Sequence, residues 1–253
     1  MGRALKILIM MTTLLAPCFA QDTQQSPLDE LKRKAQEIIR PKGQGTNALS
    51  NDKIVAGLRE ALAQSTKKAV ASTGRPDGFF KNAAIKILLP EKLRTVGKGM
   101  RMVGMGAQVD ELEVGMNRAA EQAAPAAKQI FLNSLSRMTF QDARQILTGG
   151  DTAATDYFKR TSTDQLTTAF APIVHKAMLN VGVIRQYNRL MQNPMVANSG
   201  AAQDLNIDNY VVGKTLDGLF YVMGQEEKNI RQDPMGQASA ILREVFGAAA
   251  QQR

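Results

Sequence analysis

The residues best suited to chemistry in this chain are oxygen-bearing side chains on one predicted helix. From about position 107 an apolar face repeats at helical spacing, and polar side chains recur beside it at every third or fourth position. The side of this helix next to its apolar face therefore carries four polar residues: Asp110, Glu113, Asn117 and Glu121. Arg118 lies beside them. Such a row could hold a hard cation, bind arginines, or use two carboxylates as acid and base. The ordinary polar flank of a packed helix is the other explanation.

A second group of polar residues follows the two glycines at positions 149 and 150. Two glycines permit close backbone approach, and the helix start that follows offers unpaired amide groups to an anion. Asp151 is expected to cap that helix, which would occupy these donors. The segment is therefore either a tight corner between helices or part of a binding site, with four candidate residues: Asp151, Thr155, Tyr157 and Arg160.

Glu227 is a carboxylate that falls on an apolar helical stripe. Burying a carboxylate without a partner is costly, so we expect it to meet a hydroxyl or an arginine, for which the candidates are Arg231, Arg160 and Arg118. A structural ion pair and a catalytic acid both fit this pattern. If Glu121 and Glu227 faced each other across a cleft at roughly 5–10 Å, a carboxylate-dependent hydrolase would be tenable.

The scarcity of histidine and cysteine argues against other kinds of site. Zinc sites need several imidazoles or thiolates, and a Ser-His-Asp triad would have to use His175, the only histidine. His175 lies in an apolar helical run without a nucleophile elbow, so a structural role is expected. The thirteen methionines occur at core spacing and are expected to fill gaps between helices. We expect no metal and no cofactor, and we favour a protein that is not an enzyme.

The first twenty residues indicate where the protein works. Arg3 and Lys6 precede a short apolar run, and small residues follow up to Ala20. This order predicts a secretory leader cleaved after Ala20, which would deliver the chain to the periplasm without any cysteine. Cys18 offers the alternative of a lipoprotein, although Pro17 fits a lipidation motif poorly. No other apolar run approaches about 18 residues, so no transmembrane span is expected.

Positive charge is concentrated in one region of the chain. Residues 52–101 contain eleven Lys or Arg against four acidic residues, out of a formal net charge of +9 for the whole chain. A clustered positive field attracts anions, and for an exported protein anionic lipid or envelope polysaccharide are more plausible partners than nucleic acid. A solvated basic face without a ligand is the alternative. The candidate patch consists of Arg59, Lys67, Lys68, Lys81, Lys86, Lys92, Arg94, Lys98 and Arg101.

Composition and periodicity predict an all-α fold, a single multi-helix, bundle-like domain. Aromatic residues make up 5% and tryptophan is absent, which favours helices packed on helices. Residues 84–89 form the only segment that resembles a strand. Helices are expected at about 50–74, 90–103, 107–137 with a kink at Pro125, 139–148, 151–159, 162–191, 209–231 and 233–247. Thr139 with Asp142 is expected to start the helix at 139, and Ser162 with Gln165 has the capping-box spacing that would open the helix at 162.

The domain organisation follows from these elements. Residues 1–20 are the expected leader, and residues 21–47 an N-terminal helix and linker. Residues 48–247 form the helical domain, and residues 248–253 a tail.

Several motifs together resemble a known family. They are Ala48–Asn51, Gly57–Leu62, Val109–Glu113, Met116–Glu121, Ile146–Thr155, Leu216–Phe220 and Glu226–Arg231. With these strings the chain is similar to the exported bacterial family catalogued as domain of unknown function 4197. The resemblance covers about residues 48–247 and implies a Gram-negative envelope location and a helical fold, but no activity.

Two functional hypotheses follow. The first is a non-enzymatic periplasmic binding protein that engages an anionic envelope component through the basic region at 52–101. The second is a hydrolase that uses two carboxylates on an envelope polymer, with Glu113 or Glu121 as one and Asp110, Asp151 or Glu227 as the other.

Overall fold

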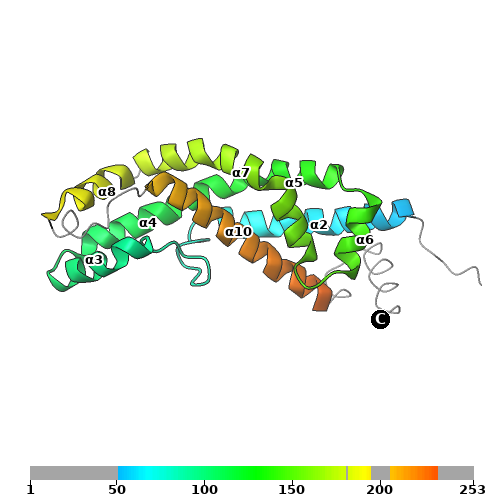
Figure 1. Ribbon diagram of the computed structural model, residues 1–253, viewed down its shortest axis with the longest axis horizontal. Coiled ribbons are helices and arrows are strands. Elements are labelled where there is room, and N and C mark those ends of the chain that lie inside the picture. Colours follow the sequence, from blue (N-terminus) through cyan, green and yellow to red (C-terminus); the bar gives the residue numbers. More distant parts are fainter. Residues whose placement is uncertain (1–50, 181, 195–205, 233–253) are drawn as a thin grey trace, which may run out of the picture. The chain divides into compact units, whose positions relative to one another are not determined.

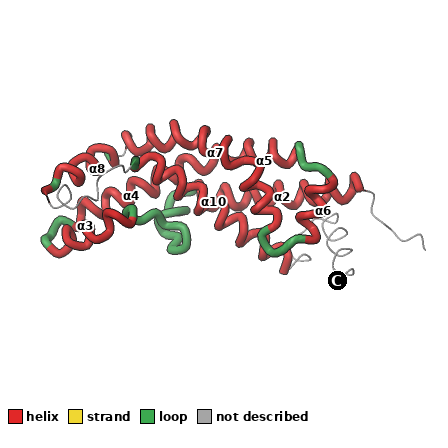
Figure 2. Tube along the Cα trace, in the orientation of Figure 1, coloured by secondary structure: helices red, strands yellow, loops and turns green. Residues whose placement is uncertain are grey.

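The computed structural model describes residues 51–180, 182–194 and 206–232, which belong to the larger of two compact units of the chain, Leu49–Arg253. All regular secondary structure in these residues is helical, so the predicted all-α class is confirmed (Figures 1 and 2). The predicted leader, the N-terminal helix and linker, the helix at 233–247 and the tail lie outside the described residues.

The three longest helices in the described residues are α2 (Asn51–Gly74), α7 (Ala153–Asn180) and α10 (Ile207–Gln232), and α10 lies between the other two. α10 packs against both α7 and α2 (Figure 1). α4 (Gly106–Ala123) packs against α7 and also contacts α3 (Glu91–Met102) and α8 (Val183–Gln192). In chain order the elements are α2 (Asn51–Gly74), α3 (Glu91–Met102), α4 (Gly106–Ala123), the 3-10 turn η1 (Ala124–Ala126), α5 (Ala127–Ser136), α6 (Phe140–Thr148), α7 (Ala153–Asn180), α8 (Val183–Gln192) and α10 (Ile207–Gln232).

A predicted helix interruption and a predicted helix start are both present in the structure. Pro125 interrupts the helix expected at 107–137, and the chain passes through η1 between α4 and α5 because proline lacks an amide hydrogen. Thr139 and Asp142 form a capping box at the start of α6. The Asp142 N–H donates to Thr139 Oγ1 at 3.1 Å, and the Thr139 N–H donates to Asp142 Oδ2 at 3.0 Å.

The prediction of two helices at 151–159 and 162–191 is wrong. α7 continues from Ala153 to Asn180 and includes Pro172. Ser162 does not cap a new helix, because it is buried and its hydroxyl donates to the Phe158 carbonyl one turn earlier. The real break comes later, where Gly182 has a φ of +75° before α8 begins.

The segment at 84–89, expected to resemble a strand, is not a strand. Residues 83–85 form a turn in which the Ile85 and Lys86 N–H groups donate to the Asn82 carbonyl, and residues 86–90, which we call the extended segment, follow without regular secondary structure. Ile85, Ile87 and Leu89 are buried while Leu88 is exposed, as the alternating pattern predicts. No strand accompanies the segment among the described residues, and its backbone bonds to side chains of α4.

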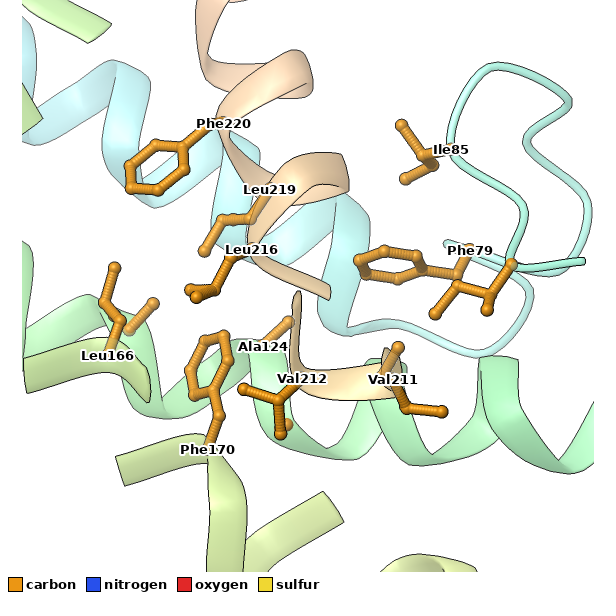
Figure 3. Close-up of a cluster of buried hydrophobic side chains, with 14 of the residues drawn as sticks. Phe79, Ile85, Ala124, Leu166, Phe170, Val211, Val212, Leu216, Leu219 and Phe220 are labelled. Carbon is orange, nitrogen blue, oxygen red and sulfur yellow. The ribbon is translucent and has the colours of Figure 1, made fainter. Parts of the chain in front are cut away.

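Phe79 anchors this loop in the hydrophobic core. Its ring is fully buried, and Figure 3 shows it between Ile85 of the loop and Val211 of α10, while Phe170 and Phe220 lie on the other side of the α10 backbone. The close approach depends on Gly218 of α10, where an added Cβ would lie 2.5 Å from Phe79 Cε1.

We predict that Gly218→Ala lowers the free energy of unfolding by about 1–3 kcal/mol, because the buried Phe79 ring must move. Gly213 provides a matched control on the same helix, since a Cβ there meets no atom within 4 Å. Gly213→Ala should raise the free energy of unfolding by roughly 0.5–1 kcal/mol through helix propensity. Urea denaturation of both variants tests this, and equal effects would contradict the packing argument.

Candidate functional site

Glu121 of α4 binds the backbone where the extended loop begins. The Phe79 and Phe80 N–H groups both donate to Glu121 Oε1 at 3.1 Å. Its other oxygen, Oε2, accepts from Arg118 Nη1 at 2.7 Å, and Arg118 Nη2 reaches Asp77 Oδ1 at 2.7 Å. The Glu121 side chain is only 5% exposed, so both of its oxygens are used inside the protein.

Asn117 and Glu113 continue this row toward the end of the loop. Asn117 is fully buried; its Oδ1 accepts from the Ile87 N–H at 2.9 Å, and its Nδ2 donates to the Ile87 carbonyl at 2.7 Å. The Leu89 N–H donates to Glu113 Oε1 at 3.2 Å. At the start of α4, Asp110 pairs with Arg101 of α3, which also lies 3.5 Å from Glu113 Oε2.

The polar row predicted on this helix therefore exists, and its main contacts are to the protein's own backbone. Among the described residues no group of three or more His, Asp, Glu or Cys side chains lies close enough to hold a metal ion. The side-chain oxygens of Glu113, Asn117 and Glu121 accept hydrogen bonds from backbone N–H groups of the loop. In a sheet, the carbonyls of a neighbouring strand would accept these bonds. This arrangement favours a scaffold over a cation site.

Asp77 carries an unusual backbone at the start of the loop. Its φ is +66°, in the left-handed region that aspartate and asparagine tolerate better than most residues. Two hydrogen bonds hold the pKa of Asp77 below its ordinary value of 3.8. The bond from Lys81 has the larger effect, and the bond from Arg118 the next largest. The lowered pKa means that Asp77 stabilises the fold at pH values above 3.8, and that this contribution is lost as the pH falls through the lower folded-state pKa.

We predict that Asp77→Asn destabilises the protein near pH 7 and that its deficit relative to the parent shrinks as the pH falls below 3.8. Asparagine keeps the backbone conformation but removes the charge that Lys81 and Arg118 bind. Urea titrations at about pH 7 and about pH 3 measure the change. Asp164→Asn, at an exposed position of α7, is the control. A deficit independent of pH would contradict the ionic explanation.

Glu227 of α10 binds the first turn of α7. The Ala154 and Thr155 N–H groups donate to its two oxygens at 2.9 and 2.8 Å, and Thr155 Oγ1 donates to Oε2 at 2.9 Å. Arg231 pairs with Glu227 at 2.8 Å and also donates to the Ile146 carbonyl at the end of α6. The carboxylate thus accepts hydrogen bonds from N–H groups that have no partner within α7, and it lies at the positive end of the α7 dipole.

This contact explains why the expected cap by Asp151 is wrong. α7 begins at Ala153, and Asp151 is an exposed turn residue ahead of it. The remaining candidates of that motif lie elsewhere: Tyr157 is buried and donates to the Ser134 carbonyl at 2.8 Å, while Arg160 reaches Asp142 at 3.4 Å. Burial raises the pKa of the Tyr157 hydroxyl. Glu121 and Glu227 share no hydrogen-bonding partner within the described part of the chain.

We predict that Glu227→Ala lowers the free energy of unfolding by about 3–5 kcal/mol, because Arg231 and the amides of α7 lose their buried partner. Glu227→Gln keeps the shape and should cost less. Glu226→Ala, at the preceding position, is the control and should change stability by less than about 0.5 kcal/mol. Denaturation followed by circular dichroism compares the three variants, and a small effect of Glu227→Ala would refute the proposed role.

The predicted basic patch is divided among separate elements. Lys67 and Lys68 are exposed on α2, and Arg59 of α2 donates to the carbonyls of Ser136 and Met138. Lys81 pairs with Asp77 at 2.8 Å. The other members lie on α3 or on the extended segment that precedes it: Lys86, Lys92, Arg94, Lys98 and Arg101.

Several of these residues line three adjoining pockets, which we call the basic groove. The first, of about 280 Å³, lies between the extended segment and α10 and shares Leu88 and Arg94 with a second, of about 160 Å³, beside α3. A third, of about 370 Å³, lies between α7 and α10 and shares Asp217 and Tyr221 with the first. The charged lining comprises Lys86, Arg94, Lys98, Arg101, Lys159, Lys214 and Lys228 against Glu113, Asp156 and Asp217.

The charge of the groove is only partly compensated. Lys214 pairs with Asp217 at 2.9 Å, which raises the pKa of Lys214, and Arg101 pairs with acids of α4. Within the described residues no ion pair involves the five remaining cations: Lys86, Arg94, Lys98, Lys159 and Lys228. The groove therefore presents a net positive field to solvent.

Residues 159, 214, 221 and 228 of this groove were missed by the sequence analysis. Lys214, Tyr221 and Lys228 recur every seven positions and so lie on one face of α10. That spacing could have identified them as a basic stripe. Lys159 carried no comparable signal, because its place beside α10 depends on tertiary packing.

A family model described as "Protein of unknown function (DUF4197)" matches residues 48–247. The chain belongs to this family. The match confirms the resemblance that the motifs indicated, and it covers all described residues. No curated protein and no solved structure matches the chain.

None of the described helices combines the length and apolar character that a membrane crossing requires.

Proposed function

We propose that this protein is exported to the periplasm of a Gram-negative cell and binds an anionic component of the envelope without catalysing a reaction. The leader-like first twenty residues support export, and the family match begins well after them, at residue 48. The observation that carries the binding role is the basic groove.

The groove combines features that suit an extended anion. Its pockets adjoin one another along the extended segment and α10, and five of their cations have no acidic partner in the described structure. Tyr221 is 47% exposed and lies in two of the pockets, where its ring can pack against an apolar part of a ligand. Repeated positive charge at an open surface attracts phosphate-bearing or carboxylate-bearing partners.

The carboxylates offer little support for the hydrolase hypothesis. Glu121 is held by Arg118 and two backbone amides, and Glu227 by Arg231 and the start of α7. A pair of catalytic carboxylates must share an open cleft and contact substrate. Neither Glu121 nor Glu227 lines the pockets of the basic groove, so the binding role is the better supported of the two.

We predict that the chain from Gln21 binds phosphatidylglycerol vesicles or the soluble polyanion heparin at low ionic strength, and that salt weakens the binding. Arg94→Glu with Lys98→Glu should weaken it about tenfold or more, because each basic residue near an anionic surface contributes on the order of 1 kcal/mol. Co-sedimentation and heparin retention measure the two interactions.

The matched control is Lys128→Glu with Lys176→Glu, which reverses two exposed charges on α5 and α7 outside the groove. It should retain most of the binding. Failure of the native chain to bind either polyanion, or an equal loss in both double variants, would refute the assignment of the groove.

A further inference from the structure

The turn between α3 and α4 presents two strongly exposed apolar side chains. Met102 is 88% exposed and Val103 is 60% exposed, whereas the other large exposed hydrophobic residues in the described part of the chain reach at most 50%. We call Met102 and Val103 the apolar tip. Adjacent apolar side chains held in water contribute nothing to the core, so they are available to a partner.

The backbone hydrogen bonds of the turn fix the apolar tip in its exposed position. Gly104 ends α3 with a φ of +84°, its N–H donates to the Arg101 carbonyl at 3.3 Å, and the Met105 N–H donates to the Met100 carbonyl at 2.9 Å. These two bonds form a Schellman motif, and Met100 anchors it in the core. The helix end is closed in this way, and its last residues point outward.

Uncompensated positive charge lies directly behind the apolar tip. Arg94, Lys98 and Met102 follow one another at four-residue spacing, so they share one face of α3. Arg101 is paired with Asp110 and Glu113, but Arg94 and Lys98 have no ion pair among the described residues and line the basic groove. Segments of peripheral proteins that bind anionic lipid combine apolar side chains, which enter the lipid surface, with nearby cations, which contact the head groups.

The same charges argue against a second copy of this chain as the partner. Two apolar tips meeting each other would bring the Arg94 and Lys98 stripes together, and like charges at an interface are unfavourable. An anionic surface complements both the tip and the stripe.

On the basis of the proposed function, we propose that the anionic partner is a lipid bilayer, into which the apolar tip inserts while Arg94 and Lys98 contact the phosphates of the head groups. The insertion is shallow, since only two side chains enter the boundary with the acyl chains. In this arrangement the tip and the part of the groove lined by Arg94 and Lys98 face the membrane together.

Co-sedimentation with phosphatidylglycerol vesicles tests the role of the tip. Met102→Ser with Val103→Ser should weaken vesicle binding about tenfold but leave heparin binding unchanged, because heparin has no apolar phase. Both positions are exposed, so the fold is retained. Phe140→Ser, at a 36% exposed apolar position on α6, is the control. If the tip variant binds vesicles like the parent while Arg94→Glu with Lys98→Glu loses binding, the insertion is refuted and the groove stands.

A fluorescent label separates insertion from contact at the surface. The chain from Gln21 contains no cysteine, so Met102→Cys creates a unique attachment site for an environment-sensitive dye, with Lys128→Cys as the control. We expect a blue shift on adding vesicles and quenching by bromine on the lipid acyl chains, at position 102 only. An unchanged spectrum with bound vesicles overturns the proposal. A blue shift that grows with protein concentration without vesicles also overturns it, since a second copy would then cover the tip.

Discussion

Much of this structure depends on one constraint. The buried backbone N–H and carbonyl groups of the loop between α2 and α3 need hydrogen-bonding partners. Residues 75–90 connect α2 to α3 with some side chains buried and others exposed, and no strand lies beside them in the described part of the chain. Buried amides without partners are costly, so α4 supplies carboxylate and amide side chains at positions 113, 117 and 121 to bind them. With the loop fixed, Phe79 fits against Gly218, and the exposed side of the segment becomes one wall of the basic groove.

Local sequence signals predicted most of the fold. The apolar periodicity, the capping box at Thr139 and Pro125 each act within a few residues, and the helices expected from them are present. The failures at Asp151 and Ser162 have a tertiary cause. Glu227 caps α7 from 72 or 73 positions away, and buried Ser162 bonds to its own helix, so neither local motif has its usual role.

The candidate site was predictable as a set of residues but not as an arrangement. Regular spacing identified the polar row on α4, but spacing alone could not show that its targets are the amides of Phe79, Ile87 and Leu89. Net charge identified residues 52–101, yet the groove also needs Lys214 and Lys228 of α10, far along the chain. Charge density along a sequence does not report which helices become neighbours.

The pairing of Asn117 with Ile87 also has a consequence for solubility. The stretch Ile85–Leu89 is mostly apolar, and an apolar segment with unpaired backbone groups is a template for intermolecular strand pairing and aggregation. In this protein the Ile87 N–H and carbonyl and the Leu89 N–H are taken by α4, and the Leu88 carbonyl accepts from the Tyr210 hydroxyl. Those four groups are occupied by side chains of α4 and α10, so they are not available to pair with a strand of another chain.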